Sequence, residues 1–156
     1  MAKVPVTIRA PEVGDEVVWK GLWQAYLGFY DQAVPPEATH LTWRRILDAA
    51  GPIFGRMAIL DGTPVGFLIC VVHEGTWSVR PTCYLEDLFV DARMRGGGVG
   101  RALLDDLVAL GRERHWNSLY WHTRADNAQA RKLYDRYVPA DNFVRYRLAI
   151  TPHRQK

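Results

Sequence analysis

The chain has 156 residues and a mass of 17.8 kDa, so we expect a single domain of ordinary size over residues 1–156. With 48% hydrophobic and 24% charged residues, its composition is that of a folded globular protein and excludes disordered and fibrous classes. No apolar run approaches the ~20 residues of a membrane span and no secretory signal is visible, so we expect no membrane partner. The two cysteines, Cys70 and Cys83, lie in apolar strand-like runs, which predicts buried thiols and a cytoplasmic location.

The net charge of +3 is unevenly distributed along the chain. Residues 1–90 hold 7 Lys and Arg against 10 Asp and Glu, whereas residues 91–156 hold 13 against 7. This pattern favours a cationic partner for the first part and an anionic partner for the second, although a solvated surface without a partner gives the same pattern. The basic part contains no recognisable nucleic-acid-binding module, so we expect no nucleic-acid partner.

Hydrophobic periodicity predicts the elements of the first half. A short strand is expected over residues 7–10, followed by a helix from Asp15, whose apolar residues recur at intervals of three and four. The Pro35-Pro36 pair ends that helix, and a second helix is expected from about 41 to 50. Two strands, 57–60 and 65–72, are then joined by Asp61-Gly62, a pair typical of hairpin turns.

The second half alternates strands and helices. Strands are expected over residues 82–90, 119–123 and 143–150, with helices over 99–114 and 127–137 between them. Such alternation favours βαβ crossovers and parallel pairing. We therefore predict an α/β fold with a mixed sheet, antiparallel in its first half and parallel in its second, flanked by about four helices.

Four glycines occupy five positions where the strand 82–90 gives way to the following helix, namely Gly96, Gly97, Gly98 and Gly100. Glycine permits positive φ, so successive backbone N–H groups can converge on a phosphate at the positive end of the helix. Arg95 and Arg101 flank the glycines with positive charge. A P-loop would need a following Lys-Ser or Lys-Thr, and a dinucleotide fold would need a third glycine in place of Leu103, so neither motif fits.

What does fit is Arg-x-x-Gly-x-Gly, which residues 95–100 match, and here the sequence resembles the GCN5-related N-acetyltransferases (GNAT). Residues 84–90, Tyr-Leu-Glu-Asp-Leu-Phe-Val, resemble the central strand of that family, and residues 127–134 resemble its Asn-x-x-Ala-x-x-Leu-Tyr segment. Within the family, the chain is similar to the spermidine/spermine and the yeast histone and polyamine acetyltransferases, which act on basic amines.

The resemblance implies that acetyl-CoA is the co-substrate. No metal is expected, because the cysteine and histidine residues lack the spacing of metal ligands. Backbone groups of the central strand would bind the pantetheine arm, the glycine loop would bind the pyrophosphate, and the start of the last helix would also contact the cofactor. The residues implied are Leu88, Phe89, Val90, Arg95, Gly96, Gly97, Gly98, Val99, Gly100, Arg101, Asn127 and Ala130. Asn127 is equally well explained as a helix cap.

Two residues are candidates for proton transfer. The resemblance places the hydroxyl of Tyr134 near the CoA sulfur, where it would protonate the leaving thiolate, although a core aromatic is the simpler interpretation. Glu86 and Asp87 are adjacent on a strand, so their side chains should point to opposite faces. Glu86 is our candidate base for the amine; an ion pair with an arginine is the alternative. His122 could also act as a base, but a buried core histidine is the more ordinary reading.

The acceptor is expected to be a small primary amine that attacks acetyl-CoA directly in a ternary complex. Tyr26 and Tyr30, four residues apart on the first helix, are expected to line its site together with Glu86 and Asp87. A cationic amine fits the acidic first part of the chain. The alternatives are another acyl-CoA or acceptor class (amino acid, aminoglycoside or protein amine), or a CoA-binding regulator without activity. A homodimer is left open.

Overall fold

A computed structural model of the chain describes residues 5–151. The chain divides into two compact units, one up to His122 and one from Thr123 onward, and each is described by itself.

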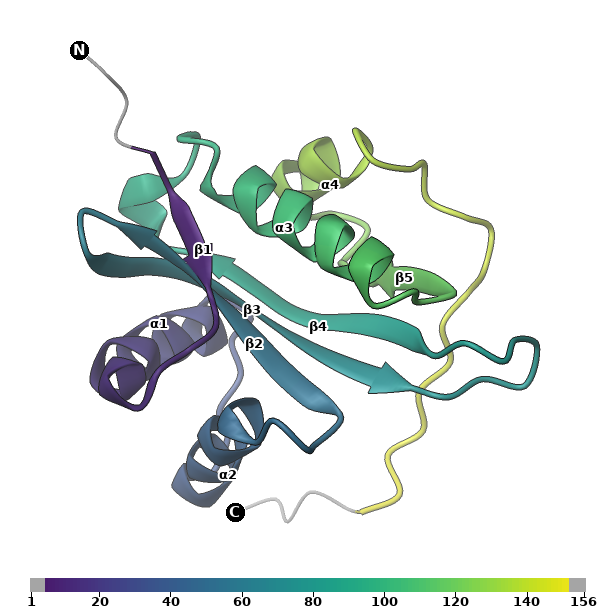
Figure 1. Cartoon of the computed structure of the whole chain (residues 1–156), viewed down its shortest axis with the longest axis horizontal. Helices are drawn as coiled ribbons and strands as arrows, with labels where there is room; N and C mark the ends of the chain where they lie inside the picture. The colour runs from purple at the N-terminus through teal and green to yellow at the C-terminus, as the bar shows by residue number, and fades with distance from the viewer. Residues whose placement is uncertain (1–4, 152–156) are drawn as a thin grey trace. The chain divides into compact units, whose positions relative to one another are not determined.

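The first unit is built on a five-stranded sheet in the order β1-β2-β3-β4-β5 (Figure 1). β1 to β4 pair antiparallel, and β4 pairs parallel with β5. The predicted mixed sheet is therefore confirmed. The strands are β1 (Thr7–Arg9), β2 (Ile53–Leu60), β3 (Thr63–His73), β4 (Thr82–Val90) and β5 (Ser118–Trp121).

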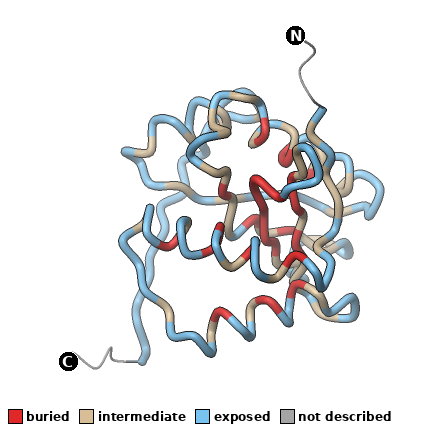
Figure 2. The backbone as a smooth tube through the Cα atoms, turned by 90° about the vertical axis from the view of Figure 1, so that its left-hand side faces the viewer, coloured by how far each residue is buried: buried red, intermediate tan, exposed pale blue. Residues whose placement is uncertain are grey.

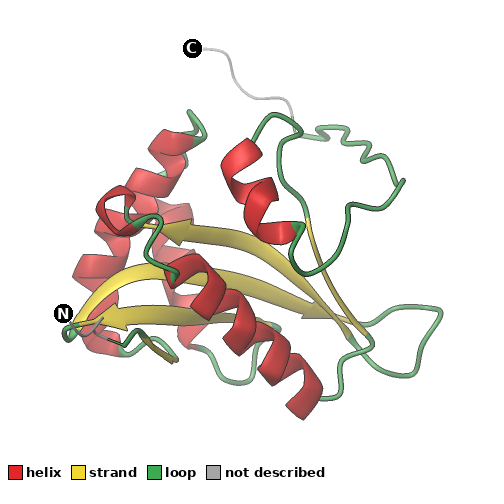
Figure 3. Cartoon of the chain, turned by 90° about the horizontal axis from the view of Figure 1, so that it is seen from above, coloured by secondary structure: helices red, strands yellow, loops and turns green. Residues whose placement is uncertain are grey.

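Three α-helices cover the two faces of this sheet. Figure 1 shows α1 (Glu16–Phe29) and α2 (Pro36–Leu47) on one face and α3 (Val99–Glu113) on the other. Figure 3 shows the long strands crossing the unit, with α3 lying over them in that view. Side chains of β3 alternate between these two faces. Phe67 and Ile69 belong to the core cluster with α1 and α2, so Leu68 and Cys70 lie on the face of α3.

The core under α1 and α2 is aromatic. Trp19 is fully buried, stacks on Trp23 with ring centroids 5.5 Å apart, and also contacts Trp43 and Phe67. In Figure 2 the buried positions concentrate on the central strands and recur along the helices. The apolar spacing of the first helix therefore reports packing, as the periodicity predicts.

Two elements begin four or more residues before their predicted starts. α2 begins at Pro36 rather than near residue 41, because proline at the first helical position loses no intrahelical hydrogen bond. β2 begins at Ile53, four residues before the predicted start. The predicted hairpin is confirmed, since Asp61 and Gly62 both have positive φ and join β2 to β3.

The second unit contains α4 (Ala128–Tyr134), as the helical prediction for this segment requires. The strand predicted over 143–150 is wrong: the structure has no strand there, and neighbouring Phe143 and Val144 are 84% and 74% exposed. A period-two pattern indicates which side chains would share a face, but it does not supply the neighbouring strand that must satisfy the backbone groups.

Gly66 on β3 lies too close to β4 for a side chain. A Cβ added there would be 2.9 Å from the backbone oxygen of Phe89. We expect Gly66→Ala to lower the free energy of unfolding by about 1–3 kcal/mol, since the strands must move apart. Gly21→Ala, in the middle of α1 with nothing within 4 Å, should instead raise it by up to ~1 kcal/mol. Urea denaturation measures the free energy of unfolding of both variants. If Gly66→Ala changes this free energy as Gly21→Ala does, the β3–β4 contact tolerates a methyl group.

Candidate functional site

β4 is longer than its parallel neighbour, and this difference opens one edge of the strand. β5 pairs with β4 only over residues 82–85, so β4 continues through residues 86–90 without a partner on that side in the described part of the chain. A strand edge without a partner presents backbone N–H and C=O groups to a ligand. The open segment contains Leu88, Phe89 and Val90, the three residues that the resemblance assigns to the pantetheine arm.

The glycine loop directly follows this open edge. Gly96 and Gly98 have φ of +77° and +88°, a region that side chains rarely adopt, so glycine is favoured at both positions. Gly98 is the N-cap of α3, and no side chain caps the helix there. The first N–H groups of a helix have no intrahelical acceptor, so Gly98, Val99 and Gly100 form a positive, uncapped terminus suited to an anion.

The two arginines beside the loop point in different directions. The guanidinium of Arg95 lies 5.3 Å from the ring centroid of Phe29 and 5.5 Å from that of Phe89, and its Nε donates to the backbone oxygen of Val90. Arg101 lies on the surface of α3, 3.6 Å from Asp105. Only Arg95 therefore faces α1.

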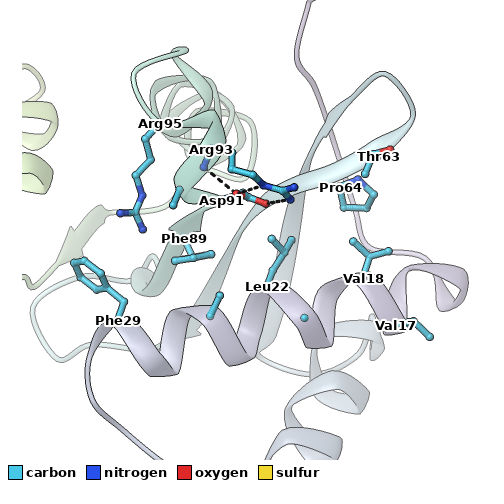
Figure 4. A pocket seen from close by; sticks show the side chains of 13 residues that line it. Val17, Val18, Leu22, Phe29, Thr63, Pro64, Phe89, Asp91, Arg93 and Arg95 are labelled. Carbon is cyan, nitrogen blue, oxygen red and sulfur yellow. Dashed lines mark hydrogen bonds and ion pairs between the residues drawn. The ribbon is translucent and has the colours of Figure 1, made fainter.

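A pocket of about 620 Å³ lies between α1 and the end of β4 (Figure 4). Its walls are mostly apolar, and Figure 4 shows Arg95 above Phe29 and Arg93 bound to Asp91 at the rim. The lining residues are Val17, Val18, Gly21, Leu22, Ala25, Phe29, Thr63, Pro64, Phe89, Asp91, Ala92, Arg93 and Arg95.

The acidic pair of β4 lies at a β-bulge. Leu85 pairs with Cys70 and Asp87 pairs with Ile69, so Glu86 is an extra residue with no partner of its own on β3. The prediction that Glu86 and Asp87 point to opposite faces relied on strict alternation, which does not hold at a bulge. Glu86 is exposed, whereas Asp87 is partly buried on the face of α1.

Tyr26 from α1 donates a hydrogen bond of 2.6 Å to Oδ1 of Asp87. The pKa of Asp87 is raised to about 6: burial raises it most, the hydrogen bond from Tyr26 opposes the rise, and the charge of Glu86 adds a smaller increase. Burial and the neighbouring Asp87 also raise the pKa of Tyr26, so the phenol stays protonated and remains a donor. The fold thus produces a carboxylate that can take up or release a proton near neutral pH.

Three of the four predicted acceptor-site residues come together here. The ring of Tyr30 contacts that of Tyr26 at 5.2 Å, and Tyr26 packs against Phe89 beside Asp87. Glu86 precedes Asp87 in the chain, and its charge acts on the Asp87 carboxyl group.

The remaining predicted residues belong to the second unit. Asn127 caps α4, since its Oδ1 accepts from the N–H of Ala130 at 3.3 Å and its Nδ2 donates to Thr123 at 3.1 Å. Tyr134 is the last residue of α4 and is partly buried. The capping role of Asn127 is confirmed.

A group of aromatic side chains on β3, on β4 and at the end of β5 was not predicted. The rings of His73, Tyr84, Tyr120 and His122 contact one another, and His122 is exposed rather than buried in the core as its ordinary reading suggested. The available signal was the spacing by two of Tyr120 and His122 in the predicted strand 119–123, although β5 ends at Trp121. That spacing does not identify the partners from other strands.

Cys70 and Cys83 are both buried free thiols, as predicted. Within residues 5–151, no group of three or more His, Cys, Asp or Glu side chains is arranged to hold a metal ion. None of the helices in that range is both long enough and apolar enough to span a bilayer.

Comparison with known proteins agrees with this geometry. The chain is 31% identical over 144 residues to a D-amino-acid N-acetyltransferase of Saccharomyces cerevisiae, covering 91% of this chain and 89% of that protein. It is also 31% identical over 152 residues to an aminoglycoside N(6')-acetyltransferase of Stenotrophomonas maltophilia, covering 94% and 95%. An aminoglycoside N-acetyltransferase solved in complex with CoA shares the fold, with a TM-score of 0.77, 21% identity and coverage of 92% and 95%.

A sequence profile described as the acetyltransferase (GNAT) family matches residues 18–138, which include the open edge of β4, the glycine loop and α4. The chain therefore belongs to the GNAT family of acetyltransferases.

Proposed function

We propose that the protein transfers the acetyl group of acetyl-CoA to a small primary amine by direct attack. The amine nitrogen forms a bond to the thioester carbonyl carbon, the C–S bond breaks, and the thiolate takes up a proton, which leaves an N-acetylated amine and CoA. The observation that carries the proposal is the open edge of β4, which leads into an uncapped, glycine-rich start of α3.

The chain's own groups fit an acyl-CoA. N–H groups at the start of α3 would hold the pyrophosphate, and the backbone of residues 88–90 would hold the pantetheine amides. A backbone N–H on this edge would also polarise the thioester carbonyl and stabilise the oxyanion of the tetrahedral intermediate. In the second unit, Asn127 and Ala130 would add contacts to the cofactor.

Direct transfer is supported by the state of the two thiols. A covalent acyl-enzyme needs an activated nucleophile, and both cysteines are buried. Burial raises the pKa of the Cys70 thiol well above its ordinary value, so the thiol stays protonated and is a poor nucleophile.

The amine must lose a proton to attack, because a free alkyl amine has a pKa near ~10. We assign the proton acceptor to Asp87 in place of Glu86. A base works best when its pKa lies near the working pH, and the pKa of Asp87 is about 6. Glu86, exposed at the bulge, would attract a cationic amine to the same place.

We assign protonation of the leaving thiolate to Tyr134. Tyr134→Phe keeps the ring and removes the hydroxyl, so we expect kcat to fall within the ~10²–10⁴-fold of proton-transfer catalysis. The KM for acetyl-CoA should change little, since the interaction forms mainly in the transition state. Steady-state kinetics measure both quantities, and Tyr137→Phe, one turn further on, is the matched control. An unchanged kcat in Tyr134→Phe would return this residue to a packing role.

The acceptor class follows from charge and from the relatives. The curated relatives act on D-amino acids and on aminoglycosides by name, both of which carry primary amines. Residues 1–90 have an excess of acidic side chains, and Glu86 and Asp87 lie on the open strand, so we propose a small cationic amine. Transfer of another acyl group is the second candidate. The homodimer and the cytoplasmic location stay predictions.

The experiment that tests the function is a CoA-release assay with acetyl-CoA and a panel of amines: diamines, aminoglycosides, D- and L-amino acids and basic peptides. Release of CoA that depends on the amine supports the proposal. Tight CoA binding without turnover on any amine would instead favour a regulator. Release with propionyl-CoA but not with acetyl-CoA would favour a different acyl group.

A further inference from the structure

Four aromatic side chains lie on the same face of the sheet as Asp87: His73, Tyr84, Tyr120 and His122, here called the tyrosine–histidine cluster. Tyr84 pairs with Val71 on β3 and with Tyr120 on β5, and paired residues share a face. His73 is two residues from Val71 on β3, so it projects from that face as well. His122 directly follows β5, and its ring contacts those of Tyr84 and Tyr120. Because Val71 is also two residues from Ile69, this is the face of α1 and α2.

The cluster is a preformed aromatic surface that solvent can reach. The rings of Tyr84 and Tyr120 are stacked, with centroids 5.0 Å apart and an interplanar angle of 20°. The His73 ring meets that of Tyr120 edge-on, and the His122 ring meets both tyrosines in the same way. Tyr120 is 38% exposed, and both histidines are exposed.

The hydrogen bonds of His73 determine how Tyr120 can meet a ligand. Nδ1 of His73 lies 2.9 Å from the backbone oxygen of Glu74, which only accepts, so in the neutral ring Nδ1 carries the hydrogen. Nε2 must then accept the hydrogen of the Tyr120 hydroxyl, 2.9 Å away. The Tyr120 oxygen is left as an acceptor, ready for a ligand that donates. Burial and Cys83 raise the pKa of Tyr120, which keeps it a neutral phenol.

The charges along β4 favour a cation at this surface. No residue of the cluster carries a fixed positive charge, and the faces of tyrosine rings attract cations. Asp87 follows Tyr84 by three residues on β4, a separation of roughly 10 Å along the strand. An extended acceptor whose amine reaches Asp87 can therefore lay its other end across Tyr84 and Tyr120.

We propose that the tyrosine–histidine cluster binds a second, non-reacting cationic nitrogen of the acceptor while the first amine reacts beside Asp87. The inference rests on the proposed function. It assigns selectivity for long diamines to Tyr84 and Tyr120, held in place by the two histidines.

The test compares α,ω-diaminoalkanes with n-alkylamines of the same chain length at pH 8, where free imidazole is neutral. We expect the ratio of kcat/KM, diamine over monoamine, to peak at about five- to tenfold for the longer chains and to be lower for 1,3-diaminopropane. Tyr120→Leu should bring the ratio near one, and Tyr120→Phe, which keeps the ring, should retain part of it. A ratio taken within one variant cancels any loss of folded protein.

Phe54→Leu removes a ring from the opposite face of the same sheet and should keep the wild-type ratio, since Phe54 pairs with Cys70. A ratio near one in the wild type, or an unchanged ratio in Tyr120→Leu, overturns the inference while the proposed function stands. Acetylation of 2-phenylethylamine in preference to every diamine also overturns it, because the surface would then recognise a ring rather than a cation. If no amine at all is acetylated, the proposed function itself fails.

Discussion

Gly98→Asp is expected to weaken acetyl-CoA binding by at least about a hundredfold. The new carboxylate would accept from the N–H groups at the start of α3, the groups that should meet the pyrophosphate, and would repel the phosphates. Loss of two hydrogen bonds to a charged group is sufficient for an effect of this size. Calorimetric titration of CoA into the purified variant measures it.

Gly98→Asn is the matched control for this substitution. Gly98 has a φ of +88°, and both Asn and Asp tolerate that region better than other side chains, so the two variants share the backbone strain and differ in charge. Binding should be weakened less in Gly98→Asn than in Gly98→Asp. Unchanged CoA affinity in a folded Gly98→Asp variant would remove the phosphate site from this loop.

Asp87→Asn is expected to lower kcat/KM for the amine by roughly 10²–10⁴-fold, the range for loss of a general base. The wild type should lose activity as the pH falls through about 6, because protonation of Asp87 removes the base. The residual activity of Asp87→Asn should not fall as the pH decreases through about 6. pH profiles of kcat/KM for both proteins measure the effect.

Two further variants distinguish the roles of the neighbours. Tyr26→Phe removes a hydrogen bond that favours the charged carboxylate of Asp87. The loss of kcat/KM at low pH should therefore occur at a higher pH than in the wild type. Glu86→Gln should keep this loss near pH 6 and reduce kcat/KM for cationic amines more than for neutral ones, an effect that weakens with salt. If Glu86→Gln abolishes the loss at low pH and Asp87→Asn retains it, the base is Glu86.

Stability separates a lost base from a lost fold. The pKa of Asp87 in the folded protein, about 6, is above the ~3.9 of a free aspartate, so between these values the folded state binds more protons than the unfolded state. The wild type therefore loses stability as the pH rises through that window, and Asp87→Asn does not. At pH 8 the thermal midpoint of Asp87→Asn should equal or exceed that of the wild type.

Features that depend on neighbouring residues were predictable from the sequence. The glycine loop is continuous in the chain, and its anion-binding property comes from backbone conformation and the helix terminus that follows, both set by local residues. The hairpin at Asp61-Gly62 and the apolar spacing of α1 are local in the same sense. The family followed from three such segments in order.

Features that depend on residues far apart in the chain were decided by the tertiary structure. Tyr26 and Asp87 are 61 residues apart, and their contact exists because α1 packs on β3 and β4. The bulge at Glu86 needs the register with β3, so the sequence alone could not choose between the two carboxylates.

The same division explains the wrong strand and the missed cluster. Residues 143–150 alternate as a strand would, yet pairing depends on a partner that the pattern does not contain. The tyrosine–histidine cluster was missed for a related reason. Its four residues, on β3, on β4, on β5 and directly after β5, form one surface only when the sheet is in register. The sequence by itself determined the loop chemistry and the family, because backbone conformation is local, whereas the base and the aromatic surface were decided by packing, which joins residues that the chain keeps apart.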